Sequence, residues 1–352
     1  MMSRIASSGR APSLMAAFSL VSAVAAPIAA QAPADTTYHI VRDIRLGGDG
    51  RWDYVVVDTV GRRLFIARQT RVMVVDPESG KLLGEVPGLV GAHGVALAYA
   101  AGHGFATSGR DSSVTMFDLR TLKVLRRTKA AEDADAVLFD PASKRVFTFN
   151  GDAGSSTAID PVSGDVVGSV PLGGKPEFGV TDGHGRLYVN IEDKAEVAEI
   201  DPARLRVTRR WSIARCEEPT GLAIDRTHHL LFSVCHNRIM AISDARAGRR
   251  IAEVPIGGGV DGGAFDPGTG LAFASNGDGT LTVVHEDGPT TFHVVSTVPT
   301  RRGARTMALD ERTHRVYTVT AAFGETPAPT KEEPRPRPSL VPGTFALLVL
   351  DR

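Results

Sequence analysis

"DPASKRVFTFN" runs from Asp140 to Asn150, and its pattern of a turn followed by an apolar strand recurs along the chain. The Asp side chain accepts hydrogen bonds from the backbone that follows it, and Pro fixes φ, so the first residues favour a tight turn. The β-branched and aromatic residues after the turn favour a strand. Related stretches begin at residues 58, 99, 182, 225, 266 and 310. Their spacing of about 41 to 44 residues indicates a repeat unit of four short strands.

The repeat units account for nearly the whole chain. Within each unit a strand such as "GLAID" (221–225) precedes the turn, and strands such as "VTMFD" (114–118) and "RRIAEVP" (249–255) complete the set. The sequence therefore predicts an all-β, seven-bladed β-propeller as a single domain over residues 38–352. A pair of β-sandwiches is the alternative, but it would not need seven similar units. The predicted units cover residues 52–88, 89–130, 131–173, 174–215, 216–257, 258–300 and 301–352.

The last unit contains three strands, and one strand precedes the first unit. That strand, "YHIVRDIRLG" at 38–47, is predicted to complete the last blade and so close the ring, which would leave no open sheet edge. Unit seven also carries the proline-rich insertion "GETPAPTKEEPRPRPSLVPG" at 324–343. Its prolines oppose regular sheet, so an extended, solvated loop is expected there.

Composition and the N-terminus restrict the class of protein. Forty basic residues balance forty acidic ones, which argues against a general nucleic-acid-binding or membrane-surface protein. Arg4 and Arg10 precede an apolar stretch that ends in small residues, so residues 1–32 are expected to be a signal peptide. The protein is therefore expected to be exported, periplasmic or secreted, with no integral membrane segment after signal removal, and monomeric.

The repeat also resembles a known family. The rhythm "DPxxxRLYVxN" followed by "VxVIDxxTGKVVxxIPVG" is similar to the YncE-like, YVTN-type β-propeller repeat family, which is related to WD40-like repeats, and "RLYVNIEDKAEVAEID" at 186–201 is the best match. The resemblance covers about residues 38–352 and implies an exported propeller without implying one activity. Some members are implicated in nucleic-acid or surface binding, and related propellers carry haem or quinones. The chain has no C-x-x-C-H motif, which excludes covalent c-type haem.

Polar residues are expected to converge on one face of the propeller. In this fold the loops before strand one and after strand two of each blade emerge on one side, here named the funnel face. The turns after strands one and three emerge on the other side, the turn face, where "DPESG" (76–80) is expected to be structural. Loop-built concave surfaces commonly bind ligands. Asp53, Asp135 and Asp261 precede first strands, and the predicted binding funnel comprises His93, Arg110, Asp111, Asn150, Asp152, Glu177, Asn190, Glu192, Glu217, Glu218, His236, Asn237, Asn276, Asp278 and Arg305.

The two cysteines, Cys216 and Cys235, lie at the funnel end of unit five. A simple hairpin through the turn at 225–230 would place Thr220 opposite Cys235, with Cys216 in the preceding loop. Since an exported protein can keep a disulfide, these cysteines are predicted to form one. The disulfide would hold the loop of Glu217 and Glu218 against strand two, which favours a structural role over a reactive thiol or a metal ligand.

No cofactor is predicted, although two kinds of metal site were considered. His93 and His236 lie on nearly opposite blades, which argues against one ion between them. Glu177, Glu192 and Glu217 form the weaker candidate, a carboxylate cluster for Ca²⁺. Ion pairing is the favoured interpretation of these carboxylates, with the cations Lys175, Lys194, Arg215 or Arg305.

Three functions follow, and the first is favoured. It is binding of a small polar ligand, or of a protein partner, in the funnel without catalysis. The alternative is a metal-assisted hydrolase or lactonase in which Glu217, Glu177 and His236 would be catalytic; no G-x-S-x-G nucleophile motif supports an esterase. The second alternative is single-stranded nucleic-acid binding, with Trp52 and Phe178 for stacking. Its basic residues would be Arg51, Arg68, Arg110, Arg301, Arg302 and Arg305, but the balanced charge argues against it.

Overall fold

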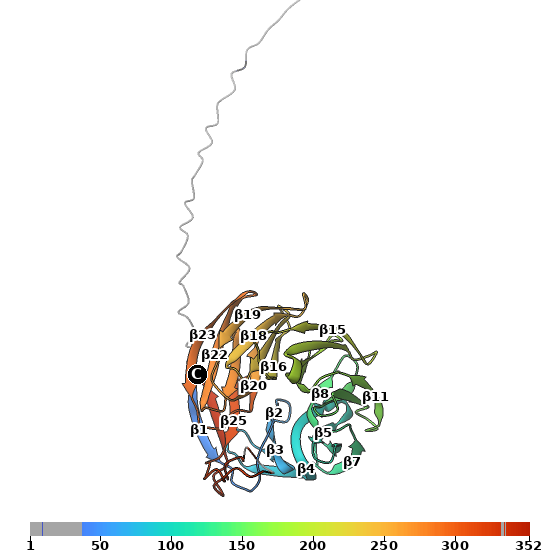
Figure 1. Cartoon of the computed structure of the whole chain (residues 1–352), viewed down its shortest axis with the longest axis vertical. Helices are drawn as coiled ribbons and strands as arrows, with labels where there is room; N and C mark the ends of the chain where they lie inside the picture. Colours follow the sequence, from blue (N-terminus) through green and yellow to red (C-terminus); the bar gives the residue numbers. More distant parts are fainter. Residues whose placement is uncertain (1–8, 10–36, 332–333, 335) are drawn as a thin grey trace, which may run out of the picture. The chain divides into compact units, whose positions relative to one another are not determined.

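The computed structural model describes residues 9, 37–331, 334 and 336–352, and it separates Met1–Asp35 from the compact unit Thr36–Arg352. Apart from Gly9, the predicted signal peptide at 1–32 lies outside the described residues. Figure 1 shows the strands of the compact unit as sheets set around a common centre. This is an all-β propeller fold, as the repeat predicts. No helix in the described part of the chain is long and apolar enough to cross a membrane.

The strands of the compact unit form six hydrogen-bonded sheets, five with four strands and one with six. Two 3-10 helices, η1 (Tyr99–Ala101) and η2 (Glu192–Lys194), lie between strands. Two sheets contain, in order of pairing, β1 (His39–Arg45), β26 (Ala346–Asp351), β25 (Arg315–Thr320) and β24 (Met307–Asp310), and β8 (Ala134–Asp140), β9 (Arg145–Asn150), β10 (Ser155–Ile159) and β11 (Val166–Pro171).

The strands of the remaining sheets are also given in order of pairing. Three have four strands: β12 (Pro176–Thr181), β13 (Leu187–Ile191), β14 (Glu196–Asp201) and β15 (Arg206–Ser212); β16 (Pro219–Asp225), β17 (Leu230–Cys235), β18 (Ile239–Asp244) and β19 (Arg249–Pro255); and β20 (Val260–Asp266), β21 (Leu271–Asn276), β22 (Thr280–Gly288) and β23 (Thr291–Pro299). The sheet of six strands contains β2 (Val55–Asp58), β3 (Arg63–Val75), β4 (Leu82–Ala98), β5 (His103–Ser108), β6 (Ser113–Asp118) and β7 (Val124–Lys129).

The prediction of seven separate blades is wrong in number, because the first two repeat units share one sheet. β3 pairs with β2 through its first residues and with β4 through its last ones, so it spans two expected strands. β4 likewise pairs with β3 through Val86 and with β5 through Val95. Gly88 and Gly91 in β4 have φ of 81° and 72°, values that suit glycine and let this strand change direction without ending.

The innermost strands follow one another around the centre of the propeller. β4 contacts β8, and the contacts continue through β12, β16, β20 and β24 to β2, which contacts β4 again. The N-terminal strand lies at the outside of this arrangement. β1 pairs antiparallel with β26, with Arg45 opposite Ala346 and His39 opposite Asp351, so the first and last strands share one sheet.

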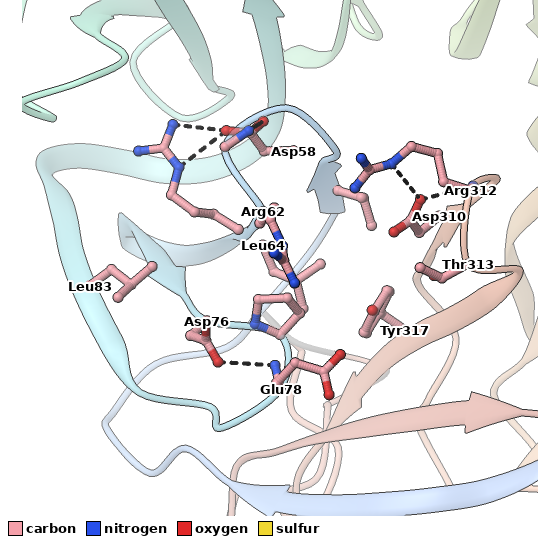
Figure 2. Close-up of a pocket in the computed structure, with 14 residues that line it drawn as sticks. Asp58, Arg62, Leu64, Asp76, Glu78, Leu83, Asp310, Arg312, Thr313 and Tyr317 are labelled. Atoms are coloured by element: carbon pink, nitrogen blue, oxygen red, sulfur yellow. Dashed lines mark hydrogen bonds and ion pairs between the residues drawn. The ribbon is translucent and has the colours of Figure 1, made fainter.

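The turn face is built from Asp-led turns (Figure 2). Asp58 accepts a hydrogen bond from the Gly61 N–H and forms an ion pair of 2.8 Å with Arg63. Asp76 accepts from the Glu78 N–H at 3.1 Å in the next turn. A recess of about 770 Å³ lies between these turns and the turn that begins at Asp310. Its two buried carboxylates are already used, Asp58 by the turn and by Arg63 and Asp310 by the Arg312 N–H, so this recess offers little unused charge.

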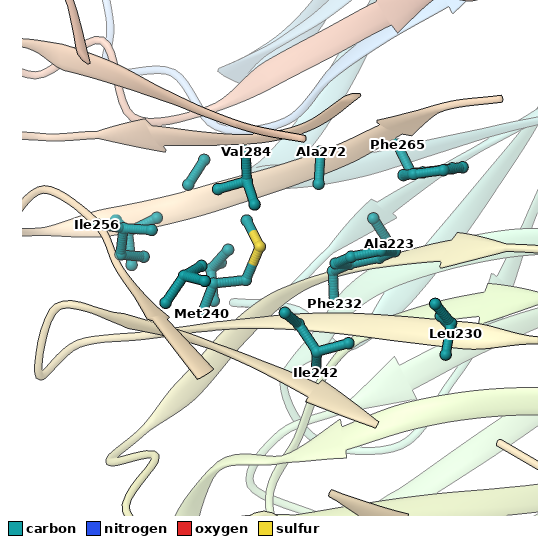
Figure 3. Packing of buried hydrophobic residues seen from close by; sticks show 13 residues of the cluster. Ala223, Leu230, Phe232, Met240, Ile242, Ile256, Phe265, Ala272 and Val284 are labelled. Carbon is teal, nitrogen blue, oxygen red and sulfur yellow. The ribbon is translucent and has the colours of Figure 1, made fainter. Parts of the chain in front are cut away.

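The core lies between neighbouring sheets, and Figure 3 shows the part between β16–β19 and β20–β23. Phe232 and Phe265 stack with ring centroids 5.1 Å apart and an interplanar angle of 9°. Met240 and Ile242 are two residues apart on β18, so strand alternation points both into the same cluster. Burial of each such side chain contributes about 1.5–3 kcal/mol, and the sheets are held together by this packing.

The insertion at 324–343 leaves β25 and returns to β26. Its two ends approach each other, because Phe323 bridges to Leu340 and the Gly324 N–H donates to the Ser339 carbonyl at 2.9 Å. Leu340 packs against the same cluster as Trp52. Most described residues of the insertion are exposed, but this end of it is anchored on the funnel face.

Candidate functional site

A recurrent β-bulge places one side chain from successive inner strands at the funnel face. The pairing of β4 with β5 shifts between Ala92 and Val95, and four other inner pairs shift at the same point of the repeat. A bulge changes the direction of a side chain relative to its strand. The bulges contain His93, Asp135, Glu177, Thr220 and Asp261, and Asp53 and Arg305 precede β2 and β24.

We define the funnel ring as the ionisable members of this set: Asp53, His93, Asp135, Glu177, Asp261 and Arg305. Thr220 is buried, and its hydroxyl lies 3.5 Å from the Val234 carbonyl, so it is not part of the charged ring. The carboxyl groups of the funnel ring act on one another electrostatically, because Asp135 raises the pKa values of Asp53, Glu177 and Asp261. Asp53 also raises the pKa of Asp261, and Asp261 raises that of Glu177. Tyr54, whose pKa is also raised by burial and by these carboxylates, adjoins the ring.

His93 joins two acids of the funnel ring. Its Nδ1 lies 2.6 Å from Asp53 Oδ2 and 3.1 Å from Asp135 Oδ1. Burial alone would lower the pKa of His93, but the hydrogen bonds and charges of Asp135 and Asp53 outweigh it and raise that pKa to about 11. Burial raises the pKa of Asp53 despite the hydrogen bond from His93. His93 is therefore an imidazolium at neutral pH.

Glu177 is held as a neutral acid. Burial, and then the charges of Asp135 and Glu192, raise the pKa of Glu177 to about 9, while Lys175 opposes the shift. Lys175 Nζ lies 2.6 Å from Glu192 Oε2 and 3.5 Å from Glu177 Oε1. Lys175 therefore forms the predicted ion pair with Glu192, and it also lies near the neutral carboxyl group of Glu177. A neutral carboxylic acid in this position can donate a proton or a hydrogen bond.

Asp261 and Arg305 complete the funnel ring on the opposite side. Arg305 Nε lies 3.2 Å from Asp261 Oδ2. Burial raises the pKa of Asp261 to about 6, with Arg305 lowering it and Asp53 and Asp135 raising it. A carboxyl group with this pKa changes its charge close to neutral pH.

Three predicted binding residues are structural instead. Asn150, Asn190 and Asn276 are fully buried at the ends of second strands. Asn190 donates to the carbonyls of Thr220 and Gly221, and accepts from the Ser233 hydroxyl, so it ties two neighbouring sheets together. Asn150 and Asn276 bond to threonine hydroxyls of the following strand. The end of a second strand thus faces the core at these positions. The tendency of Asn to form turns does not by itself predict this burial.

The predicted disulfide is present. Cys216 and Cys235 are bonded, with Cα atoms 5.4 Å apart, and both are buried. The expected register is wrong by one residue, because Pro219 lies opposite Cys235 where Thr220 was expected. The bulge in β16 adds the residue that accounts for this shift. The disulfide thereby fixes the loop that leads into the inner strand of this sheet.

The loop beside the disulfide holds four predicted residues but does not enter the funnel ring directly. His236 Nδ1 lies 2.6 Å from Glu218 Oε2 in an exposed ion pair. The Glu217 N–H donates to Asn237 Oδ1, and the Glu217 carbonyl accepts from the His236 N–H. These contacts shape the loop. Of this group, His236 is near enough to lower the pKa of Asp261.

The other predicted residues lie around the ring. Asp152 helps raise the pKa of Asp133, after burial and Asp135. Asp111 accepts from the Ser113 hydroxyl at 2.7 Å, and Asp278 accepts from the Gly258 N–H at 2.6 Å, so both stabilise loops. Arg110 lines a recess of about 420 Å³ that reaches the funnel ring at Asp53 and His93.

A second recess, of about 360 Å³, adjoins the first on the funnel face. The two share Arg51, Trp52 and Arg337, so the anchored end of the insertion contributes to both walls. Arg302 and Arg305 also line the second recess, whose described lining contains no carboxylate. The funnel ring is thus rich in carboxyl groups, while the recess beside it is lined by guanidinium groups.

Two observations oppose the nucleic-acid interpretation. Arg68 is fully buried, donates to the carbonyls of Gly48, Asp49 and Gly50, and stacks 3.7 Å from the Phe345 ring. It therefore clamps the N-terminal loop and offers nothing to a phosphate. Phe178 packs against Tyr54 with centroids 5.4 Å apart, so this ring is also engaged within the protein.

Comparison with known proteins identifies the fold without a family. No protein-family model matches the chain, and no curated protein matches it in sequence. A solved chain described as Kuenenia stuttgartiensis hydrazine synthase is similar in structure, with a TM-score of 0.67 and 17% sequence identity. The match covers 81% of this chain and 95% of that one. At this identity the likeness supports the β-propeller fold alone.

Proposed function

We propose that the protein is an exported binding propeller whose funnel ring holds a small polar ligand with a cationic group. The observation that carries this proposal is the set of four mutually repelling carboxyl groups, Asp53, Asp135, Glu177 and Asp261. A cation placed between them would relieve the repulsion that, after burial, raises the pKa values of Asp53, Glu177 and Asp261. Binding energy would then come from the attraction between the cation and the carboxylates, and Glu177 would lose its proton to solvent as the cation binds.

The neighbouring arginines suggest the rest of the ligand. Arg302, Arg305 and Arg337 line the adjacent recess, and guanidinium groups bind carboxylates and phosphates well. A zwitterion with its cationic end in the funnel ring and its anionic end in the recess would satisfy both surfaces. A lysine or arginine side chain on a partner protein's loop would use the same ring.

Export is the second part of the proposal. The apolar N-terminal stretch, the resemblance to YncE-like repeats and the disulfide Cys216–Cys235 all support a periplasmic or secreted protein. A disulfide persists in such compartments, where thiols are not kept reduced, and this one restrains the chain beside the funnel face.

The test is calorimetric titration of the purified mature protein with free lysine, arginine, diamines and choline. Citrate and glycerol serve as anionic and neutral comparisons. We expect the cationic compounds to bind and to release a proton from Glu177, which appears as a dependence of the heat on the buffer. Glu177→Gln should remove this proton release and weaken binding at least tenfold. Glu217→Gln, in the neighbouring loop, is the matched control and should change neither.

Two results would contradict the proposal. One is binding of citrate or glycerol in preference to every cation. The other is unchanged affinity and proton release in Glu177→Gln, since the funnel ring would then not be the binding site.

One observation favours a second candidate, a metal-assisted hydrolase or lactonase. Ligand atoms of Asp53, His93 and Asp135 lie within 4.8 Å of one another, a spacing that suits one cation. Glu177 as a neutral acid could protonate a leaving group. Metal analysis of the exported protein distinguishes the candidates: stoichiometric metal that is lost in Asp135→Asn would favour the hydrolase, whereas its absence favours the binding protein.

A further inference from the structure

A separate cluster of metal-type ligands lies on the turn face, between two sheets. Asp225 ends β16, His228 lies in the turn that follows, and Glu286 lies near the end of β22 in the next sheet. His228 Nδ1 is 2.7 Å from Asp225 Oδ2 and 2.6 Å from Glu286 Oε1. These three ligand atoms lie within 4.8 Å of one another. The cluster lines a recess of about 340 Å³.

The carboxylate of Glu286 lacks some of the hydrogen bonds that a buried carboxylate needs. Its side chain is 3% exposed, and its Oε2 has no hydrogen-bond partner among the described residues. A buried carboxylate oxygen without a partner is destabilising, because it has lost its hydrogen bonds to water. Burial raises the pKa of Glu286, Asp225 raises it further, and His228 opposes the shift. The recess wall thus contains a carboxylate that one imidazole does not fully satisfy.

The role of Asp225 differs from that of Glu286. Asp225 accepts from the N–H groups of Thr227 and His228, so the turn itself holds this carboxylate in place. The Glu286 N–H donates to the Gly270 carbonyl, which fixes the end of β22 beside the same recess. The Asp225 carboxylate and the backbone of Glu286 are therefore held in place before any ligand binds, which lowers the entropy cost of binding.

We propose that Asp225, His228 and Glu286 bind a divalent transition cation of the Zn²⁺ class. One imidazole and two carboxylates suit such a cation better than Ca²⁺, which prefers oxygen ligands alone. Bonds of about 2.0–2.2 Å to Zn²⁺ would set the ligand atoms roughly 3.3 Å apart, so the side chains would separate by less than ~1 Å. The cation replaces the proton on His228 Nδ1, which is released to solvent.

The consequence of binding is a link between two sheets. His228 and Asp225 belong to the sheet β16–β19, and Glu286 belongs to the sheet β20–β23. One cation held by all three would connect them at the turn face, beyond the packed core between them. This site is independent of the funnel ring, which lies on the other face.

A second group of ligands must be controlled in the test. His285 and His293 both contact Asp287, at 2.8 and 2.5 Å, and these three residues could bind Zn²⁺ at the surface. Asp53, His93 and Asp135 in the funnel ring could also bind a cation, so the experiment starts from the variant His285→Ala/His293→Ala/Asp135→Asn. Titration of that variant with ZnCl₂, followed by calorimetry and thermal unfolding, is expected to show one site and a higher Tm. Replacement of Zn²⁺ by Co²⁺ should give visible absorption bands from the bound ion.

Two further substitutions in this background test the ligands. Glu286→Gln and His228→Ala should each weaken Zn²⁺ binding at least tenfold and abolish the rise in Tm, with circular dichroism showing the same fold. His184→Ala, an exposed histidine in a turn of the preceding sheet, is the matched control and should bind as the background does. The proposal is overturned if the background variant binds no Zn²⁺, if both substitutions leave its affinity unchanged, or if Ca²⁺ binds as tightly as Zn²⁺.

Discussion

Two residues of the funnel ring are held in protonation states that differ from those of the free side chains at neutral pH. Burial disfavours an imidazolium, yet His93 stays charged because Asp53 and Asp135 flank it. The reverse holds for Glu177, which burial and two acidic neighbours keep neutral. A ligand that interacts favourably with these residues would therefore gain electrostatic free energy on binding to the ring.

Replacement of His93 tests this account at the residue scale. The pKa of His93 is raised in the folded protein, so its stabilising effect is full below the unfolded value near 6.5 and is lost as pH rises towards 11. His93→Gln would leave two partly buried carboxylates without their cation, and we expect a loss of about 2–4 kcal/mol at pH 6. The loss should shrink by pH 10. Urea unfolding at pH 6, 8 and 10 measures it, with His184→Gln as control, and a loss independent of pH would contradict the assignment.

Glu177 should respond to pH in the opposite sense. A carboxyl group whose folded pKa is raised to about 9 destabilises the fold increasingly as pH rises from about 4.5 to 9. Glu177→Gln removes that penalty, and each pKa unit corresponds to about 1.4 kcal/mol. We expect the variant to be more stable than the wild type at pH 8, by at most about 5 kcal/mol, and equal to it at pH 4. Urea unfolding of both proteins at these two pH values measures the difference, and a variant less stable at pH 8 would contradict the raised pKa.

At the scale of the strand, the sequence predicted which segments would face the funnel but not which side chains would be available there. Turn residues and the disulfide pairing follow from local chemistry, and the structure confirms both. Bulges are set by how a strand fits its neighbours, so local chemistry did not show that Pro219 would lie opposite Cys235. Local chemistry also fails for Asn190, because asparagine is typical of turns but this one is buried between sheets.

A comparison of equivalent positions across the repeats could have found the funnel ring. Asp53, Asp135 and Asp261 were placed before first strands but were not selected for the binding funnel. They occupy the same point of the repeat as His93 and Glu177, and acidic residues are unusual beside the apolar strands that follow. Tyr54 gives no such signal, because a tyrosine before a strand fits an ordinary core position equally well.

The disulfide yields the prediction that belongs to this scale. Cys216 and Cys235 are separated by 19 positions, and closing a loop of this length stabilises a fold by about 3 kcal/mol. We expect Cys216→Ser/Cys235→Ser to lose about that much stability in urea unfolding. Ligand affinity at the funnel ring should fall less than threefold, because neither cysteine contacts the ring. A loss of binding without a loss of stability would give the disulfide a functional role instead.

For the whole molecule, the repeat predicted the architecture correctly and the number of sheets incorrectly. A turn signal separates units in sequence, but hydrogen bonding decides whether two units share a sheet. β3 and β4 run through the positions where strands were expected to end, and Gly88 and Gly91 allow it. No pattern of apolar residues distinguishes a strand that bends from two strands that meet.

We propose that β1 closes the propeller, since it pairs with β26 and its neighbour Tyr38 is buried against Phe273 with ring centroids 5.1 Å apart. A variant that begins at Leu46 would expose the edge of β26 and lose these contacts. We expect its Tm to fall by more than 10 °C, or the protein to aggregate through the open edge. A variant that begins at Thr36 is the matched control and should unfold as the mature protein does. A synthetic peptide of residues 36–47 should restore much of the lost Tm, because it can reoccupy the edge of β26. Equal stability of the two variants would show that the ring holds without its first strand.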